Sequence, residues 1–375
     1  MKENKAPALF GLPTPFSFNL SIAAERWKTM QPFEMTDEQR RVATDTVQLH
    51  EAYIATFFKS RSYRGGMHWK RAKGKEYLFR SLDRYGYGKS LGPRSKETET
   101  IYKEFHDQKK IVFSRLKGLK ERLRQQARFC KAARIARVPR VVGAVLRLLE
   151  QHRLMGASLQ IVGTHALYAY EARAGIFFEK GLLATQDMDL LWDVRPKLRL
   201  FATGEVDAGG LIDLLRKADH SFDLLGKRSF RAVNQAGYMV DLIKPEPESL
   251  HLQEKRQMGG TKDLVAAEIK NLQWLVSSPK LEQVVIGEDG YPATMVVPDP
   301  RAFAIHKLWV AHQKSREAVK KKRDRSQALA VCKVILTYLP EYQFRRDELR
   351  MFPEEIVSDA ARAMENSDMP PGYEA

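Results

Sequence analysis

Three aspartates are the residues of this chain best suited to chemistry. Asp187 and Asp189 stand in the segment "TQDMDLLWD", and Asp241 stands in "GYMVDLI". Side chains at positions i and i+2 of a strand point to the same face, so Asp187 and Asp189 share a face. Like charges held close together repel unless a cation bridges them, which suits Mg²⁺ or Mn²⁺. The structural alternative is that Asp187 caps a turn and Asp189 is solvated.

A glycine and a threonine precede this pair. In "IVGTHAL", Gly163 and Thr164 stand between an apolar strand and a helical pattern. Free N–H groups at a helix start can receive a phosphate, and a glycine lets the backbone come close to it. The Thr164 hydroxyl can hydrogen-bond the same group. Asp241 has apolar neighbours, which predicts a buried or half-buried acid that needs a partner.

This order of residues resembles the nucleotidyltransferase superfamily that includes polymerase β. It is more closely similar to bacterial nucleotidyltransferase-fold proteins related to abortive-infection toxins, over roughly residues 140 to 340. The resemblance implies that Asp187, Asp189 and Asp241 hold two divalent ions, Mg²⁺ or Mn²⁺. It also implies that Gly163 and Thr164 hold the phosphates of an NTP.

The chain departs from that family in two places. Thr164 stands where serine or glycine is usual, but it keeps the hydroxyl. Gly163 and Asp187 are 24 positions apart, about twice the spacing of compact members. The extra segment "EARAGIFFEKGLLA" is predicted to form a loop or an extended helix over the site. The longer spacing weakens the motif but does not remove it, because surface insertions cost little free energy.

Two C-terminal residues extend the resemblance. Lys307 stands in "AFAIHKLWVAHQ", and Asp324 ends a basic cluster that starts at Lys320. The resemblance implies that Lys307 contacts the nucleotide phosphates and that Asp324 orients a basic group or the acceptor. The structural alternative is a Lys307 that reaches out to solvent and a solvated basic surface around Asp324.

The chain is strongly basic, with a formal charge of +17, and residues 101 to 150 hold fourteen Lys or Arg and four acids. Such a field recruits nucleic acid or nucleotides, although a solvated surface is the alternative. Basic and aromatic residues also alternate upstream of this stretch, which predicts an acceptor-binding surface or else a small aromatic core. The candidates for acceptor binding are Trp69, Lys70, Arg71, Tyr77 and Arg80.

A P-loop and a cysteine site are excluded. In "YGYGKSLGPRS", Asp83 stands where the P-loop motif needs its first glycine, and no apolar strand leads into the segment. The two cysteines, Cys130 and Cys332, lie far apart in predicted helices, so they indicate core residues rather than a disulfide or zinc site.

Strands and helices alternate after Gly156, which predicts an α/β (α+β) core with a mixed sheet, between a mainly helical N-terminal region and C-terminal helices. The predicted divisions are a flexible arm at 1–35, a basic helical region with a β-hairpin insertion at 36–138, the nucleotidyltransferase core at 139–298, a helical portion at 299–365 and a disordered tail at 366–375.

The sequence therefore predicts a cytoplasmic enzyme that transfers NMP from an NTP to an acceptor hydroxyl by a two-metal mechanism. Neither a signal peptide nor a membrane helix is indicated, so no membrane partner is expected. The acceptor remains open between RNA, including tRNA, a protein and a small molecule. RNA or DNA would bind through the basic N-terminal region, and the toxin resemblance adds a cognate neutralising protein as a partner. The alternative function is nucleic acid binding by an inactive nucleotidyltransferase scaffold.

Overall fold

The computed structural model describes residues 32–83, 85–195, 210–247 and 256–365. The fold is mixed α/β with a mixed sheet, as predicted. The predicted tail at 366–375 and nearly all of the predicted arm at 1–35 lie outside the described residues. Among the residues described, every helix is too short or too polar to cross a membrane.

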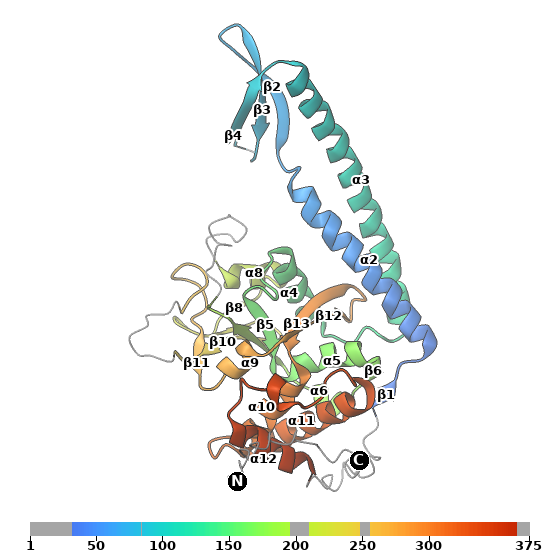
Figure 1. Cartoon of the computed structure of the whole chain (residues 1–375). Helices are drawn as coiled ribbons and strands as arrows, with labels where there is room; N and C mark the ends of the chain where they lie inside the picture. Colours follow the sequence, from blue (N-terminus) through green and yellow to red (C-terminus); the bar gives the residue numbers. More distant parts are fainter. Residues whose placement is uncertain (1–31, 84, 196–209, 248–255, 366–375) are drawn as a thin grey trace, which may run out of the picture.

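A long pair of helices, α2 (Asp37–Arg61) and α3 (Lys96–Ala132), projects from the core (Figure 1). Thr36 caps α2 in a reciprocal arrangement with Gln39, which satisfies two backbone donors at the helix start. Leu116, Leu123 and Cys130 are buried along one side of α3, as their helical spacing predicts. This buried seam of α3 packs against α2.

A three-stranded sheet closes the far end of this pair. Its strands β2 (Gly66–Ala72) and β3 (Lys75–Ser81) form the predicted hairpin around Lys73 and Gly74. The sequence did not predict the third strand, β4 (Gly88–Pro93), which pairs with β3 in an antiparallel arrangement. Two of its six residues are glycines and one is proline, which weakens the pattern expected of a strand.

The core sheet has the strand order β5-β7-β10-β9-β8, and β11 pairs with the second half of β10. Only the β7–β10 and β10–β11 pairs are parallel; the other described pairs of this sheet are antiparallel. The strands of this sheet are β5 (Leu159–Val162), β7 (Asp187–Trp192), β8 (Asp223–Leu224), β9 (Arg231–Val233), β10 (Met239–Pro245) and β11 (Ala267–Ile269).

Helices and a hairpin cover this sheet. The hairpin of β12 (Lys280–Ile286) and β13 (Pro292–Pro298) turns at Asp289-Gly290, a residue pair typical of hairpin turns. The remaining elements are α4 (Arg140–Gln151), the short 3-10 helix η1 (Gly163–His165), α5 (Ala166–Ala174), α6 (Lys180–Leu183), α8 (Leu211–Ala218), α9 (Gln273–Ser277), α10 (Pro300–His312), α11 (Ala318–Tyr338), η2 (Arg346–Glu348) and α12 (Glu354–Glu365).

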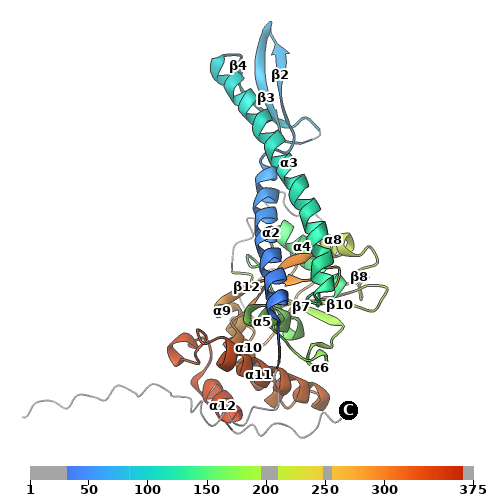
Figure 2. The ribbon, with the colours of Figure 1, turned by 90° about the vertical axis from the view of Figure 1, so that its right-hand side faces the viewer.

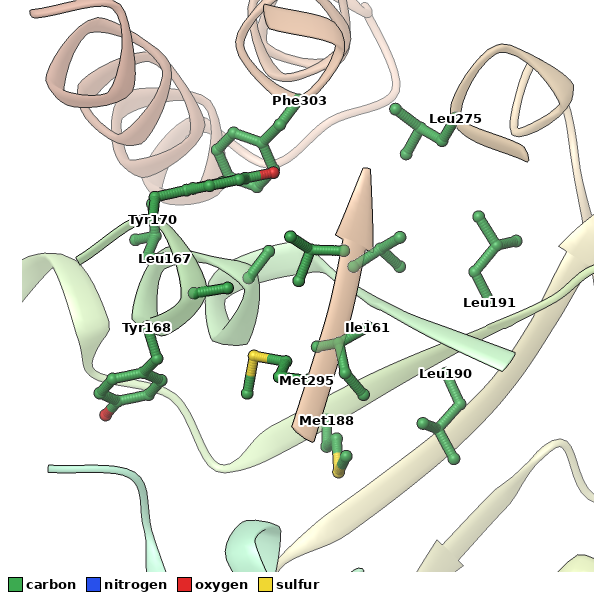
Figure 3. Packing of buried hydrophobic residues seen from close by; sticks show 14 of the residues in the cluster. Ile161, Leu167, Tyr168, Tyr170, Met188, Leu190, Leu191, Leu275, Met295 and Phe303 are labelled. Carbon is green, nitrogen blue, oxygen red and sulfur yellow. The ribbon is translucent and has the colours of Figure 1, made fainter. Parts of the chain in front are cut away.

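The alternation along β7 explains how it serves both the core and a site. Met188 and Leu190 are fully buried and pack with Ile161 of β5 and Met295 of β13 (Figure 3). Asp187 and Asp189 alternate with them and are only partly buried. A strand period of two thus anchors one face in the core and leaves two carboxylates on the other.

The segment between α5 and β7 does not form the predicted loop or extended helix. Gly175 ends α5 in the left-handed conformation, and β6 (Ile176–Phe177) follows at once. This strand pairs with β1 (Phe33–Glu34), so the insertion ties the start of the N-terminal region to the core. The turn residue Gly175 stops the helix before it can extend.

The helix pair is joined to the core a second time at the β12–β13 turn. The backbone N–H groups of Arg137 and Val138 both donate to the carbonyl of Ile286, each at 3.0 Å. Gly290 lies against the end of α3, where a Cβ would stand 2.1 Å from the carbonyl oxygen of Ala127. Only glycine fits there, and its φ of 84° also favours glycine.

We expect Gly290→Ala to lower the free energy of unfolding by more than about 1 kcal/mol, because the new methyl group meets backbone and the φ is strained. Gly74→Ala is the matched control, since its φ is 76° but nothing lies within 4 Å of the added Cβ. Urea denaturation followed by circular dichroism measures both. Equal losses would contradict a close contact between Gly290 and α3.

Candidate active site

The strand register brings the three predicted aspartates to one face of the sheet, near the N-terminal ends of the two parallel strands β7 and β10. Asp241 of β10 is the parallel partner of Asp189 of β7. Neighbouring strands lie about 4.8 Å apart, and partner residues point to the same face. Asp187 lies two residues before Asp189 and so shares this face. The three carboxylates therefore gather near the beginning of the parallel pair.

Gly163 lies directly against this cluster. Val162 pairs with Asp189 across β5 and β7, so the chain turns at Gly163 just beside the carboxylate. A Cβ on Gly163 would stand 2.3 Å from Oδ2 of Asp189, and its φ of 67° also favours glycine. The backbone that the sequence assigned to phosphate binding is therefore adjacent to the carboxylates.

Thr164 is buried and held by α11. Its hydroxyl accepts a hydrogen bond from Nε2 of Gln327 at 3.1 Å, and the same Nε2 donates to the carbonyl of Leu182. Within the described ranges, Oε1 of Gln327 and Nδ1 of His165 are buried without a hydrogen-bond partner. Burial lowers the pKa of His165 to about 4, so the imidazole is neutral. Buried polar atoms without partners beside Thr164 are consistent with a site that is completed by a ligand.

The carboxylates repel one another. Burial, followed by the charges of Asp187 and Asp241, raises the pKa of Asp189 to about 7, against the opposing effects of Lys307 and Arg231. Asp187 also accepts a hydrogen bond from the Thr185 hydroxyl. A cluster of this kind gains stability from any cation that enters it.

Arg231 is a functional candidate that the sequence did not reveal. Its guanidinium donates to both oxygens of Asp241, at 2.7 and 2.6 Å, from the antiparallel partner position on β9. Asp241 is buried, as predicted, and Arg231 is the partner that a buried acid requires. Because β9 has three residues, its pattern was too short to recognise.

Lys307 and Asp324 form a buried cluster with Arg316. The Lys307 ammonium lies 2.7 Å from one oxygen of Asp324, and Arg316 lies 2.7 Å from the other. Asp324 is fully buried, which excludes the solvated alternative. Burial lowers the pKa of Lys307, while Asp324 and Asp189 oppose this shift. Lys307 thus lies between its anchor and the carboxylate cluster.

The donor chemistry fits a divalent cation, with one obstacle. Oxygen ligands from adjacent strands on one face are what Mg²⁺ and Mn²⁺ prefer. As the described side chains stand, however, no group of three His, Cys, Asp or Glu residues is arranged to hold a metal. Arg231 occupies both oxygens of Asp241, so ion binding there requires Arg231 to release them.

The predicted acceptor-binding residues lie on β2 and β3, at the far end of the helix pair from the core (Figure 1). Arg80 corrects the prediction, because it is buried and donates to the carbonyls of Gly66 and Ser62, both at 3.0 Å. Trp69 packs 5.8 Å from the ring of Tyr102. These contacts match the aromatic-core alternative.

The other three candidates stay closer to solvent. Lys70 is exposed, with its ammonium 3.5 Å from the ring centroid of Phe79, and Arg71 is exposed as well. Tyr77 is half-buried. None of the five is brought near the carboxylates, because the length of α2 and α3 separates the two ends.

Asp189→Asn should stabilise the metal-free protein at pH 8, by roughly 1–3 kcal/mol. The folded chain binds the Asp189 proton more tightly than the unfolded chain, so the wild type loses stability as pH rises from about 4 to about 7. Thermal unfolding at pH 5 and pH 8 measures this, with the exposed Asp223→Asn as control. A variant less stable than the wild type at pH 8 would contradict carboxylate crowding.

Comparison with known proteins agrees with this geometry. A nucleotidyltransferase family model matches residues 140–351, more than half of the chain. A search of curated proteins and a search of solved structures found no match. The matched residues include Gly163, the three aspartates and Lys307. The chain therefore belongs to a nucleotidyltransferase family.

Proposed function

We propose that this protein transfers NMP from an NTP to a hydroxyl group of an acceptor, using two divalent ions, Mg²⁺ or Mn²⁺. The observation that carries the proposal is the pairing of Asp189 with Asp241 beside Gly163. This pairing places carboxylates, which suit divalent cations, next to the backbone turn at Gly163, which suits the phosphates of a nucleotide.

In the proposed reaction, the acceptor oxygen attacks the α-phosphorus of the NTP. A bond forms between that oxygen and phosphorus, the bond to the β-phosphate oxygen breaks, and pyrophosphate leaves. Asp187, Asp189 and Asp241 would hold the ions, which neutralise charge and gather the reacting oxygens. Asp241 lies nearest the acceptor in this scheme and receives its proton or ligates the ion beside it.

The remaining residues would position the NTP. Gly163 offers backbone to the phosphates, and Thr164 offers a hydroxyl held in place by Gln327. Lys307 contributes a positive charge that Asp324 keeps oriented. Arg231 balances the charge of Asp241 until the ion binds, and is then free to contact a phosphate.

The similarity of the motifs to abortive-infection toxins suggests RNA, and tRNA in particular, as the acceptor. The strongly basic N-terminal region supports a polyanionic acceptor of this kind. A cognate protein that neutralises the activity is part of the same proposal.

A second candidate function is nucleic acid binding by an inactive scaffold. It is favoured by the bidentate contact of Arg231 with Asp241, which fills the position of a metal ligand. The two functions differ in whether the carboxylates bind Mn²⁺, because a scaffold does not need the ion.

We expect label transfer when the protein is incubated with each α-labelled NTP, Mn²⁺ and total RNA or cell extract. Asp187→Asn and Asp241→Asn should lower the transfer by at least about 100-fold, because ion binding and acceptor activation are lost. Asp223→Asn, an exposed acid on the same sheet, is the matched control and should retain it. Equal labelling by the wild type and both site variants would rule out this mechanism.

A further inference from the structure

A pocket of about 820 Å³ lies where the base of the helix pair meets the core. Figure 2 shows the lower end of α3 against the core. The pocket is lined by residues from distant parts of the chain: Gln39, Lys131, Arg134, Ala136, Arg137, Pro139, Tyr168, Phe177, Lys180, Leu183, Ala184, Thr185 and Glu288.

The pocket adjoins the candidate active site. Thr185 lines it and donates a hydrogen bond to the carboxylate of Asp187. One wall of the pocket is therefore only two residues from the first catalytic candidate. One hydrogen bond, from Thr185 to Asp187, thus connects the pocket wall with the carboxylates.

The pocket is positively charged. Lys131, Arg134 and Lys180 are exposed, and none of them forms an ion pair with a residue that the structure describes. Arg137 is a fourth cation, paired with the buried Glu171. Glu288 is the acid among the lining residues, so the lining favours an anionic ligand.

Arg134 is held in an unusual conformation. Its φ is 58°, in the left-handed region, and its N–H donates to the carbonyl of Lys131 as α3 ends. A non-glycine residue in this region costs on the order of 1 kcal/mol. Arg134 therefore lines the pocket from a backbone position in which a glycine would be less strained.

A basic stripe on α3, defined as Lys103, Lys110, Lys117, Arg124 and Lys131, leads into the pocket. These residues repeat every seven positions and are all exposed, and the drift of about 20° per repeat winds them from the side opposite the buried seam toward its flank. The spacing corresponds to about 10 Å along a helix. Glu121 pairs with Arg124, and the other four form no ion pair within the described residues. The stripe ends at Lys131 in the pocket wall.

A line of cations about 40 Å long exceeds what a single nucleotide can contact, since α-helices rise 1.5 Å per residue. It suits a polyanion that runs along α3. The half-buried ring of Phe177, with the Arg137 guanidinium 5.0 Å from its centroid, adds an aromatic and cationic surface for a base. Together these features favour a polynucleotide over a protein or a small-molecule acceptor.

We propose that this pocket binds the single-stranded end of a nucleic acid acceptor, with its terminal phosphates on Lys131, Arg134 and Lys180 and its terminal hydroxyl directed past Thr185. This inference rests on the proposed nucleotidyl transfer and names its acceptor site. Lys131 and Arg134 lie before the matched family region. In this proposal the N-terminal region therefore contributes acceptor contacts, and it does so at the end of α3 next to the core and not at the distal sheet.

The test measures fluorescence anisotropy of short labelled single-stranded RNA and DNA oligonucleotides with the full chain, without NTP. We expect the triple variant Lys131→Ala/Arg134→Ala/Lys180→Ala to bind at least about tenfold more weakly. Its salt dependence should also be shallower, by up to about 2 in the slope of log K against log salt, because three phosphate contacts are lost. Thermal unfolding checks that the variant is folded.

The comparison variant is Lys70→Ala/Arg71→Ala/Lys75→Ala, which removes the same charge from the distal sheet, the acceptor surface that the sequence predicted and that this proposal replaces. We expect its affinity to change less than twofold. An unchanged affinity of the pocket variant, an equal loss in the distal variant, or no binding of either oligonucleotide by the wild type would overturn the proposal. A preference for RNA or for DNA supports it and identifies the acceptor.

Failure of this inference can be separated from failure of the proposed function. If label transfer to the oligonucleotide continues undiminished in the pocket variant, the pocket is not the acceptor site, although the transferase stands. If binding depends on the pocket but the wild type transfers no nucleotide, the binding site stands and the transferase proposal fails. Label on protein alone would overturn the nucleic acid assignment.

Discussion

The repulsion among Asp187, Asp189 and Asp241 is the constraint on which the rest of the core depends. Two parallel strands in register place two acids side by side, and the strand period adds the third. Such an arrangement is unfavourable without positive charge nearby. Arg231 and Lys307 lower the pKa of Asp189, and Arg231 binds Asp241 directly. Arg231 and Lys307 therefore balance the negative charge of the three carboxylates. In the proposed function, a bound metal ion or nucleotide would change the contacts of these two cations.

Those cations are themselves positioned by buried partners. Lys307 is fixed by Asp324, which also binds Arg316, so the positive charge beside the site depends on an acid in α11. Gln327, on the same helix as Asp324, holds the Thr164 hydroxyl. One face of α11 thus positions both Lys307 and Thr164, the residues that we propose bind the nucleotide. The family match, which extends to residue 351, includes this helix.

The N-terminal region lies before the matched residues, yet it is joined to the core at several points. β1 pairs with β6, the chain after α3 bonds to Ile286, and Gly290 packs on Ala127. These contacts fix the end of α3 beside the site. The basic end of α3 therefore lies beside the site, where the proposed acceptor would bind, and the distal sheet is built around its own aromatic contacts.

Local patterns predicted much of the fold. The shared face of Asp187 and Asp189 on β7 and the hairpin of β2 and β3 were both predicted, because each depends on residues close in sequence. The prediction for Arg80 failed because alternation along a strand does not show which of its two faces packs against the rest of the protein. In β3, the face that carries Arg80 packs against Phe105 of α3.

Features assembled from distant segments could not be predicted. Arg231 reaches Asp241 from a three-residue strand, which carries too little pattern to recognise. The pocket combines residues from 39 to 288, so its charge appears only once the chain is folded. Gly163 and Asp189 were each recognised by type, but their contact depends on the β5–β7 register.

The most direct test of the account is a crystal structure with Mn²⁺ and a non-hydrolysable NTP, in which anomalous scattering locates the ions. The account predicts Mn²⁺ on Asp187 and Asp189 and a second ion on Asp241, with Arg231 moved off that carboxylate and the triphosphate beside Gly163. Nucleotide bound elsewhere, with no anomalous signal at the carboxylates and Arg231 still paired with Asp241, would contradict it.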